Sequence, residues 1–383
     1  MPMIRKRFRQ CDEATRLWKE PAVEKETEIT LKDIARETGY SLVSVHRALS
    51  GKSGVGTEAR RAILQCAEAL HYRPNVMASA LKRRQREIAI VLPKRQECGA
   101  RYFDYMWKGC NAYREESDGL GVHYSEYEFD TGAHGEQECE GEIAALERLL
   151  ESSEIPPDGL LTVAVTRTDA LIEVLQRFSE RGTQIVLIDN DLPVPRLCCI
   201  APSDENTGRL GAELICGMLH HERGTVLVVG GNRYSPSHLA NASGFADYVR
   251  THRPNLRVVT ASDEEGAPDP VCYAKILRED PGIVAAYSVR AKSTLPLCEA
   301  ALKLEGERRL LLLGSDLFPE SAEMLRRGVL NGIIYKNPYE KGYRGLKTLA
   351  EFLRSDVRPR SDNLSVPISV ILRSNLVFFE EFI

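Results

Sequence analysis

Short apolar runs alternate with amphipathic stretches along most of the chain, from residue 87 to the C-terminal end. The apolar runs have the length of strands, and the stretches between them carry apolar residues at helical spacing. This alternation predicts parallel sheets covered by helices on both faces, and about 300 residues are too many for one sheet, so two lobes are expected. The expected strands are Ile88–Leu92, Gly159–Val163, Gln184–Ile188, Thr225–Val229, Arg257–Thr260, Ile283–Tyr287 and Arg309–Leu313, and the expected helices include Glu138–Glu151, Thr168–Glu180, Gly208–Leu219, Ala242–Arg250 and Leu295–Leu304.

A different pattern fills residues 29–73, where three short helices and no strand are expected. Thr30 and Asp33 have the spacing of a capping box at the start of the first helix, and Gly39 ends it. Ser41 is expected to cap the second helix and Thr57 the third. Two short helices joined through a glycine predict a helix-turn-helix. The expected core residues are Leu31, Ile34 and Ala35 in the first helix, Val45, Ala48 and Leu49 in the second, and Ile63, Leu64, Ala67 and Leu70 in the third.

The second of these helices has the features of a recognition helix, which meets base edges with its N-terminal end. Arg47 can bind guanine through two hydrogen bonds, and Leu42 and Val43 can pack on thymine methyl groups. Core packing is the alternative for Leu42 and Val43, although the helix already has a buried stripe on its other side. The residues expected to contact DNA in and beside this helix are Thr30, Ser41, Leu42, Val43, Ser44, His46 and Arg47.

Charge is divided unevenly between the two regions. The chain of 383 residues has a formal net charge of −4. Residues 29–86 contain 11 Lys or Arg and 4 Asp or Glu, whereas residues 87–383 have a net charge of −12. A small basic region beside a large acidic body is typical of a nucleic-acid-binding domain joined to a sensing domain, but a solvated basic surface without a partner would look the same.

The motifs of residues 30–84 resemble those of LacI-type bacterial repressors. The segment reads TLKDIARETGYSLVSVHRALSGKSGVGTEARRAILQCAEALHYRPNVMASALKRR, with KDIA, GYS, VHRAL, TEARRAI and YRPN in the order of that family. The resemblance implies a repressor that binds a palindromic operator as a homodimer, and such dimers could pair into tetramers. His46 stands where the family usually has a small hydroxyl residue, and Met77 where a small or aliphatic residue is common.

Residues 74–86 take the place of the family's hinge helix, which folds in the minor groove when it pairs with its dimer mate. Asn75, Ala78 and Leu81 share one side of this segment, and Leu81 holds the place of the leucine that wedges between base steps. A flexible basic linker is the alternative. Residues 1–28 precede the helix-turn-helix domain of residues 29–73 and are expected to be a disordered extension.

Residues 87–383 resemble the effector-binding and dimerisation domain of the same family, whose fold is that of type I periplasmic sugar-binding proteins. The resemblance implies two doubly wound parallel-sheet lobes joined by three crossings, which we expect near Pro202–Asp204, Tyr335–Asn337 and Val357–Asp362. Lobe 1 would then hold residues 87–202 and 337–357, and lobe 2 residues 204–334 and 360–383. The segments that carry the resemblance include Ile88–Pro93, Leu187–Asp189, Thr207–Glu213, Leu313–Asp316, Asn337–Tyr339 and Leu372–Ser374.

The effector is expected in the cleft at the carboxyl ends of the strands. Aromatic rings there would stack on a sugar ring, and carboxylates and amides would bind its hydroxyls. Each candidate could instead be an ordinary loop or cap residue, and Asp189 and Asp316 are favoured because their flanking motifs match. The candidates are Tyr102, Phe103, Asp189, Asn190, Asn241, Ser288, Arg290, Asp316, Lys336 and Asn337.

Three positions depart from the family's sugar-binding pattern. Asn241 stands where an arginine commonly binds hydroxyls, Arg290 lies where an Asn-Asp pair is expected, and Lys336 stands where glutamine is frequent. These cations favour an anionic or otherwise atypical sugar derivative as the effector.

Enzyme motifs are missing from the sequence. It contains no HExxH, GxSxG or Walker motif, and its eight histidines and ten cysteines show no metal-ligand spacing, so we expect no enzyme, cofactor or metal. A cytoplasmic location is expected, because no apolar run approaches the roughly 18 residues of a membrane span and the N-terminus has no signal-peptide core. The alternative is a solute-binding protein of a sugar transporter, which would need a signal peptide and would have no use for residues 29–86.

Overall fold

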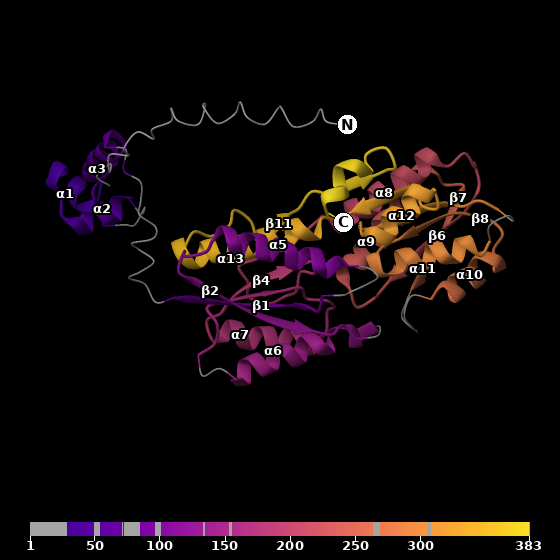
Figure 1. Cartoon of the computed structure of the whole chain (residues 1–383), viewed down its shortest axis with the longest axis horizontal. Helices are drawn as coiled ribbons and strands as arrows, with labels where there is room; N and C mark the ends of the chain where they lie inside the picture. The colour runs from indigo at the N-terminus through magenta and orange to yellow at the C-terminus, as the bar shows by residue number, and fades with distance from the viewer. Residues whose placement is uncertain are drawn as a thin grey trace, which may run out of the picture. The chain divides into compact units, whose positions relative to one another are not determined.

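The computed structural model describes residues 29–49, 54–70, 72, 85–95, 101–132, 135–152, 155–262, 269–304 and 308–382. The chain divides into two compact units, Met1–Ser79 and Ala80–Ile383 (Figure 1). Most of the expected hinge segment, including Asn75, Ala78 and Leu81, lies outside the described residues.

The first unit is a small three-helix domain. Its helices are α1 (Leu31–Thr38), α2 (Leu42–Leu49) and α3 (Thr57–Ala69). At the start of α1, the Asp33 carboxylate accepts hydrogen bonds from the Thr30 N–H at 2.9 Å and the Thr30 hydroxyl at 2.6 Å. Gly39 ends the helix with φ 73°, a left-handed conformation that suits glycine. The helix-turn-helix is therefore present.

This domain differs from the expectation at one core residue and at one helix cap. Ile34, Val45, Ala48, Ile63 and Ala67 are buried. Leu64 is 44% exposed because it lies on the outer face of α3, so its assignment to the core was wrong. Thr57 is the first residue of α3 and Gly56 is the N-cap, so the expected cap was also wrong by one residue.

The second unit contains two six-stranded sheets. The first has the order β11-β5-β4-β3-β1-β2 and the second β12-β10-β9-β8-β6-β7. Every pairing is parallel except that of β12 with β10. The strands are β1 (Arg86–Pro93), β2 (Val122–Phe129), β3 (Gly159–Thr162), β4 (Gln184–Ile188), β5 (Cys198–Ala201), β6 (Gly224–Gly231), β7 (Leu256–Ser262), β8 (Ile283–Ser288), β9 (Leu311–Ser315), β10 (Gly332–Tyr335), β11 (Asn363–Ser365) and β12 (Ser369–Ile371).

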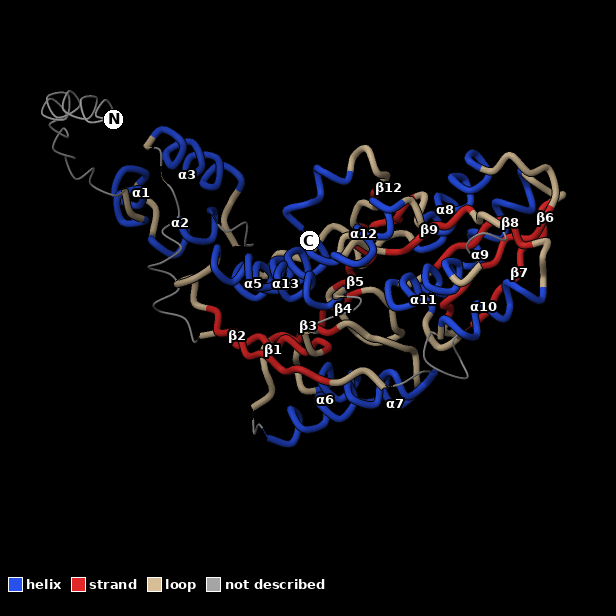
Figure 2. The backbone as a smooth tube through the Cα atoms, turned by 45° about the vertical axis from the view of Figure 1, so that its right-hand side comes forward, coloured by secondary structure: helices blue, strands red, loops and turns tan. Residues whose placement is uncertain are grey.

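Helices cover both faces of each sheet, which confirms the predicted fold class. In the first sheet, α6 and α7 lie on one face and α5 and α13 on the other (Figures 1 and 2). In the second sheet, alternate residues of β6 enter different clusters: Leu227 packs with α10, α11 and α12, and Val226 packs with α8 and α9. The helices are α5 (Tyr102–Glu116), α6 (Glu140–Ser152), α7 (Asp169–Glu180), α8 (Asp204–Met218), α9 (Pro236–His252), α10 (Pro270–Glu279), α11 (Ala291–Leu302), α12 (Pro319–Arg327) and α13 (Pro338–Ser355), with 3-10 helices η2 (Gly135–Cys139) and η3 (Leu376–Phe382).

The chain passes between the two lobes three times. It leaves the first sheet after β5 and enters α8, and it returns after β10 into α13. The third passage lies between β11, which pairs with β5, and β12, which pairs with β10. It therefore falls at residues 366–368, and its expected place at Val357–Asp362 was wrong because residues 363–365 add one more strand to the first sheet.

Helices α5 and α13 pack with their backbones in contact. A Cβ at Gly109 would lie 2.0 Å from the carbonyl oxygen of Tyr339, and one at Gly342 would lie 2.1 Å from that of Met106. Only glycine permits this approach. It brings the first residue of α5, Tyr102, next to Lys341 of α13, and both side chains belong to the site described below.

Candidate functional site

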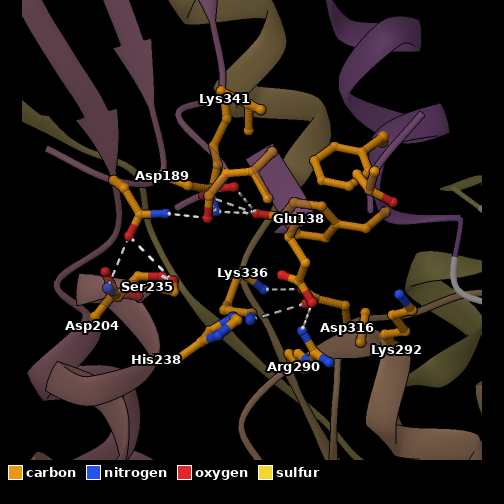
Figure 3. A pocket seen from close by; sticks show the side chains of 18 of the residues that line it. Glu138, Asp189, Asp204, Ser235, His238, Arg290, Lys292, Asp316, Lys336 and Lys341 are labelled. Carbon is orange, nitrogen blue, oxygen red and sulfur yellow. Dashed lines mark hydrogen bonds and ion pairs between the residues drawn. The ribbon is translucent and has the colours of Figure 1, made fainter. Parts of the chain in front are cut away.

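A cavity of about 440 Å³ lies between the two lobes, and we call it the interlobe cavity. Its walls come from loops at the carboxyl ends of strands and from the first turns of the helices that follow. The lining residues are Tyr102, Phe103, Thr131, Glu138, Val163, Val165, Asp189, Asn190, Asp204, Ser235, Ser237, His238, Arg290, Ala291, Lys292, Leu295, Pro296, Glu299, Asp316, Lys336 and Lys341 (Figure 3).

Two aspartates occupy equivalent positions in the two lobes. Asp189 directly follows β4 and Asp316 directly follows β9. Both have left-handed backbones, with φ 68° and 63°. The N–H of Asp189 donates to the Ile200 carbonyl at 3.1 Å, and that of Asp316 donates to the Ile334 carbonyl at 2.9 Å. Because non-glycine residues rarely adopt this conformation, these bonds to the neighbouring strand are needed to hold both carboxylates at the cavity.

In lobe 1, Asp189 forms a buried cluster with Lys341 and Tyr102. The Lys341 ammonium is paired with the Asp189 carboxylate, and it donates to the Tyr102 hydroxyl at 2.5 Å. The Tyr102 hydroxyl in turn donates to both Asp189 oxygens at 2.9 Å. Burial, followed by the nearby carboxylates, raises the pKa of Tyr102 well above its ordinary value, so its hydroxyl remains a hydrogen-bond donor.

In lobe 2, Asp316 pairs with Lys336. The Lys336 ammonium lies 3.3 Å from one Asp316 oxygen, and the Lys336 backbone N–H donates to the other at 2.9 Å. The ammonium also donates to the carbonyl of Val289 at 3.1 Å. Burial acts to lower the pKa of Lys336, but the carboxylates around it, Asp316 first, raise it further, so the net direction is upward and the lysine is charged.

Polar contacts join the two lobes across the cavity. Glu138 of lobe 1 accepts a hydrogen bond from Arg290 of lobe 2 at 2.8 Å, and both side chains are buried. The second Glu138 oxygen accepts from Asn232 at 3.2 Å. Asn190 of lobe 1 accepts from the backbone N–H of Ser237 at 2.9 Å. Figure 3 shows Glu138 and Arg290 pointing toward one another. These contacts stabilise the approach of the lobes.

A buried carboxylate organises the loop that follows β3. Glu142 accepts hydrogen bonds from the Thr162 hydroxyl at 2.6 Å and from the N–H groups of Ala164 and Val165 at 3.0 and 2.9 Å. The Asn190 amide donates to the Ala164 carbonyl at 2.9 Å. Burial raises the pKa of Glu142 although all three donors lower it. Together these bonds fix the loop that carries Val165 to the cavity wall.

Asp204 begins α8 at the first passage between the lobes. Its carboxylate makes no hydrogen bond or ion pair within the described part of the chain. Burial raises its pKa to about 7, the lysines Lys341 and Lys336 oppose this rise, and the nearby carboxylates add to it. The site therefore compensates this charge incompletely.

His238 lies in the first turn of α9 and lines the cavity. Its Nδ1 is buried and has no hydrogen-bond partner among the described residues. Burial, followed by the cations Arg290 and Lys336, lowers its pKa well below the ordinary value. The imidazole is therefore neutral at physiological pH, where it can donate or accept a hydrogen bond.

The structure brings seven of the ten effector candidates to the cavity. These are Tyr102, Phe103, Asp189, Asn190, Arg290, Asp316 and Lys336. Glu138, Asp204, His238 and Lys341 line the same space but were not predicted. Lys341 follows the recognised Asn337–Tyr339 motif by two residues and lies one helical turn inside α13, which is the one signal that pointed to it.

Three candidates point elsewhere, so their assignment to the cavity was wrong. Asn241 is buried inside lobe 2 and accepts a hydrogen bond from Tyr287 at 3.0 Å, because α9 packs its backbone there against Gly208 of α8. The Ser288 hydroxyl donates to the Arg290 carbonyl at 2.8 Å. Asn337 caps α13 by accepting from the Glu340 N–H at 3.2 Å.

Arg290 and Lys336, the two cations that favoured an anionic effector, are both paired with carboxylates of the protein. Arg290 is paired with Glu138 and Lys336 with Asp316, so the protein already compensates both positive charges.

The exposed end of α2 in the helix-turn-helix domain matches the expected recognition face. Leu42 and Val43 are 44% and 60% exposed, so the alternative of core packing does not hold. His46 and Arg47 are also exposed, whereas Val45 and Ala48 on the opposite side are buried.

The described residues contain neither a membrane-spanning helix nor a cluster of metal-binding side chains. None of their helices is long and apolar enough to cross a membrane. No group of three or more His, Cys, Asp and Glu side chains in these ranges could hold a metal ion.

The fold and the cavity define a two-lobed ligand-binding domain, joined in one chain to a helix-turn-helix domain. Residues 88–356 match the family of the periplasmic binding protein domain, and the chain belongs to that family. Residues 30–75 match the bacterial regulatory proteins of the lacI family. Both families consist of binding and regulatory proteins.

Each of the curated relatives matches only part of the chain. The HTH-type transcriptional regulator RegA from Clostridium acetobutylicum is 38% identical over 65 residues, which are 17% of this chain and 20% of that protein. Catabolite control protein A from Streptococcus mutans is 33% identical over 82 residues, 21% of this chain and 24% of that protein. The D-allose-binding periplasmic protein from Escherichia coli is 21% identical over 194 residues, 48% of this chain and 62% of that protein. The matches to the two regulators thus span less than a quarter of their lengths.

Solved structures share the fold of the second unit. GanP, a glucose-galactose binding protein from Geobacillus stearothermophilus, superposes with a TM-score of 0.65 at 19% identity, over 76% of this chain and 99% of that one. A periplasmic ribose ABC transporter structure from Conexibacter woesei gives a TM-score of 0.64 at 16% identity, over 78% and 95%. At these identities the likeness concerns the fold alone.

Proposed function

We propose that this chain is a ligand-responsive transcriptional regulator, a repressor of carbohydrate-related genes that acts in the cytoplasm as a homodimer. One observation carries the proposal: the same chain holds a helix-turn-helix domain in which α2 exposes Leu42, Val43 and Arg47, and a two-lobed domain whose cavity is lined by charged and aromatic side chains. The regulators and the sugar-binding protein that match parts of this chain support the two halves of this assignment.

DNA recognition is assigned to the N-terminal end of α2. Leu42 and Val43 would pack on thymine methyl groups and Arg47 would bind guanine in the major groove. Thr30, Ser41, Ser44 and His46 would contact phosphates. Two such domains would occupy the halves of a palindromic operator. Residues 74–86 would pair in the minor groove between them, with Leu81 as the apolar wedge.

The effector is assigned to the interlobe cavity. Asp189 and Asp316 present carboxylate oxygens from opposite lobes, and Tyr102 and Phe103 add aromatic surface, which together suit a small polyhydroxylated compound. A ligand that contacts both lobes changes their relative position and so alters DNA affinity. The coupling is reciprocal, so a ligand that weakens DNA binding must bind less tightly to the DNA-bound form.

The proposal is tested with operator fragments selected from random DNA by the full-length chain. We expect a palindromic consensus, a specific affinity far above that for random DNA, and a shift of that affinity by one class of small carbohydrate in a screen. Loss of sequence preference would refute the regulator assignment, and an operator affinity that no compound in the screen changes would refute the sensing role.

The alternative of a transporter's solute-binding protein is supported by the fold of the second unit and its likeness to GanP. That function leaves the helix-turn-helix domain without a role. A chain that binds a sugar tightly but shows no preference between operator and random DNA would favour it.

A further inference from the structure

Three carboxylates and two ammonium groups meet where the chain passes between the lobes. Asp189 is paired with Lys341 and Asp316 with Lys336. Asp204 is the third carboxylate, and its oxygens find no hydrogen-bond or ion-pair partner in the described ranges. All five side chains line the interlobe cavity. With every group ionised, this part of the cavity wall has a net charge of −1.

The opposite part of the cavity does not balance this charge. Glu138 and Arg290 neutralise one another across the lobes. His238 is neutral because burial and the neighbouring cations lower its pKa. Of the remaining charged lining residues, Lys292 and Glu299 lie together on α11 and carry opposite charges. The uncompensated negative charge is therefore confined to the surroundings of Asp204.

Asp204 is half-buried, and a partly desolvated carboxylate without a counterion is costly, so a cation placed beside it gains free energy. The site responds by favouring the protonated form of Asp204, whose pKa is raised to about 7. A ligand cation would remove that need, because it would supply the missing positive charge and hydrogen-bond donors together. An ammonium group has three such donors.

We propose that the ligand of the interlobe cavity is a polyhydroxylated compound that carries one protonated amino group, an amino sugar or a close analogue, with its ammonium bound to Asp204. The hydroxyls of this compound bind the carboxylates of Asp189 and Asp316, which remain paired with their lysines. The inference rests on the proposed function, in which this cavity is the effector site, and it names the chemical class of the effector.

The test is calorimetric titration of the full-length chain with matched sugars and no DNA. The probes are D-glucosamine and D-galactosamine, the neutral D-glucose and D-galactose, and the acidic D-glucuronate and D-galacturonate. We expect the amino sugars to bind roughly 10- to 100-fold more tightly than their neutral counterparts, the range of a charge-assisted hydrogen bond. Asp204→Asn should remove this preference, because the amide keeps the shape but not the charge. Glu213→Gln, a change at an exposed carboxylate of α8 that does not line the cavity, should leave it intact.

A second readout uses the unmodified protein. Because the pKa of Asp204 is raised to about 7, a fraction of its carboxyl groups holds a proton near neutral pH, and binding of an ammonium ligand should release protons into the buffer. Titrations in two buffers of different ionisation enthalpy measure this release. Lys336, Lys341, Asp189, Asp316, Tyr102 and His238 face the same space, and Asp204→Asn should abolish the release if Asp204 is its source.

Three results would overturn the inference: no amino sugar binds more tightly than its neutral counterpart, the acidic sugars bind best, or Asp204→Asn retains the preference. Because DNA is absent, this outcome is separate from that of the proposed function. Amino-sugar binding that leaves operator affinity unchanged would refute the sensing role and support the amino sugar as the ligand class. Operator release by a neutral sugar alone would support the sensing role and refute the amino sugar as the ligand class.

Discussion

The ion pair between Glu138 and Arg290 makes the position of the lobes sensitive to a single substitution. Both side chains are less than a tenth exposed, and their 2.8 Å contact crosses the cavity. Glu138→Gln keeps the size of the side chain and removes the charge that compensates Arg290. Breaking a buried pair from one side typically costs about 3–5 kcal/mol, because the remaining charge stays out of water.

This cost falls on one form of the domain. When the lobes separate, Arg290 is hydrated and the penalty disappears, so the substitution should shift the equilibrium toward separated lobes. An energy of about 3–5 kcal/mol corresponds to a change of roughly a hundred-fold to several thousand-fold. Hydrogen exchange of segments 135–142 and 288–294, with small-angle scattering of the full chain, measures the shift. Exchange in both segments should accelerate at least tenfold, and the radius of gyration should increase.

Two matched variants complete the experiment. Asp247→Asn breaks the exposed pair with Arg250, whose side chains are 41% and 76% exposed, and should change neither measurement because such pairs contribute little. Glu138→Leu combined with Arg290→Met removes both charges and should restore slow exchange. The reasoning fails if Glu138→Gln leaves exchange at the wild-type rate, or if the apolar double variant exchanges as fast as the single one.

Three further predictions concern separate parts of the chain. Arg47→Ala should weaken operator binding by about 1–3 kcal/mol and relax the preference at one base pair, as measured by anisotropy on a set of operator variants; an equal loss on every variant would contradict base reading. Between the unfolded pKa of Asp204 near 3.8 and its folded pKa of about 7, the folded chain holds a proton that the unfolded chain does not, so wild-type stability falls as the pH rises through this window. Asp204→Asn should therefore stabilise the protein by about 1–2 kcal/mol more at pH 8 than at pH 5 in denaturant titrations. An equal change in unfolding free energy at both pH values would count against the raised pKa. Gly109→Ala should lower the unfolding free energy by at least about 2 kcal/mol, because its Cβ would lie 2.0 Å from the Tyr339 carbonyl oxygen. Gly217→Ala has open space around it and should be neutral or slightly stabilising. Similar melting temperatures for both variants would refute the close packing of α5 on α13.

Seven strands of the body could be predicted because burial on both faces leaves continuous hydrophobic runs, whereas the equally apolar β5 and β10, of four residues each, were missed. All seven expected strands are present. Strand β2 was missed because its sequence, VHYSEYEF, contains no continuous apolar run. It lies at the edge of its sheet, and most of its residues are only partly buried or exposed and can be polar. Strand β11 was missed for a similar reason, since its three residues have one apolar side chain between them, and that omission displaced the third passage.

The cavity could be predicted where its residues follow a strand directly, as with Asp189, Asp316 and Lys336. Residues on helices were harder, because the packing of one helix on another decides which side of a turn faces the ligand. His238 and Asn241 are three residues apart on α9, and only the contact of Asn241 with Gly208 turns His238 rather than Asn241 toward the cavity. Glu138 was missed because its partner Arg290 is 152 residues away along the chain.

The second passage between the lobes supplies the counterions of both aspartates. Lys336 pairs with Asp316 in lobe 2, and Lys341 pairs with Asp189 in lobe 1. Because each lysine pairs with the aspartate of its own lobe, the lobes can turn about the short stretch between the two lysines without lengthening either ion pair. Mobile salt ions stabilise separated charges more than paired ones. Neither pair separates when the lobes turn, so these two pairs give ionic strength no hold on the angle between the lobes, and the salt dependence of this chain should come mainly from its contacts with DNA.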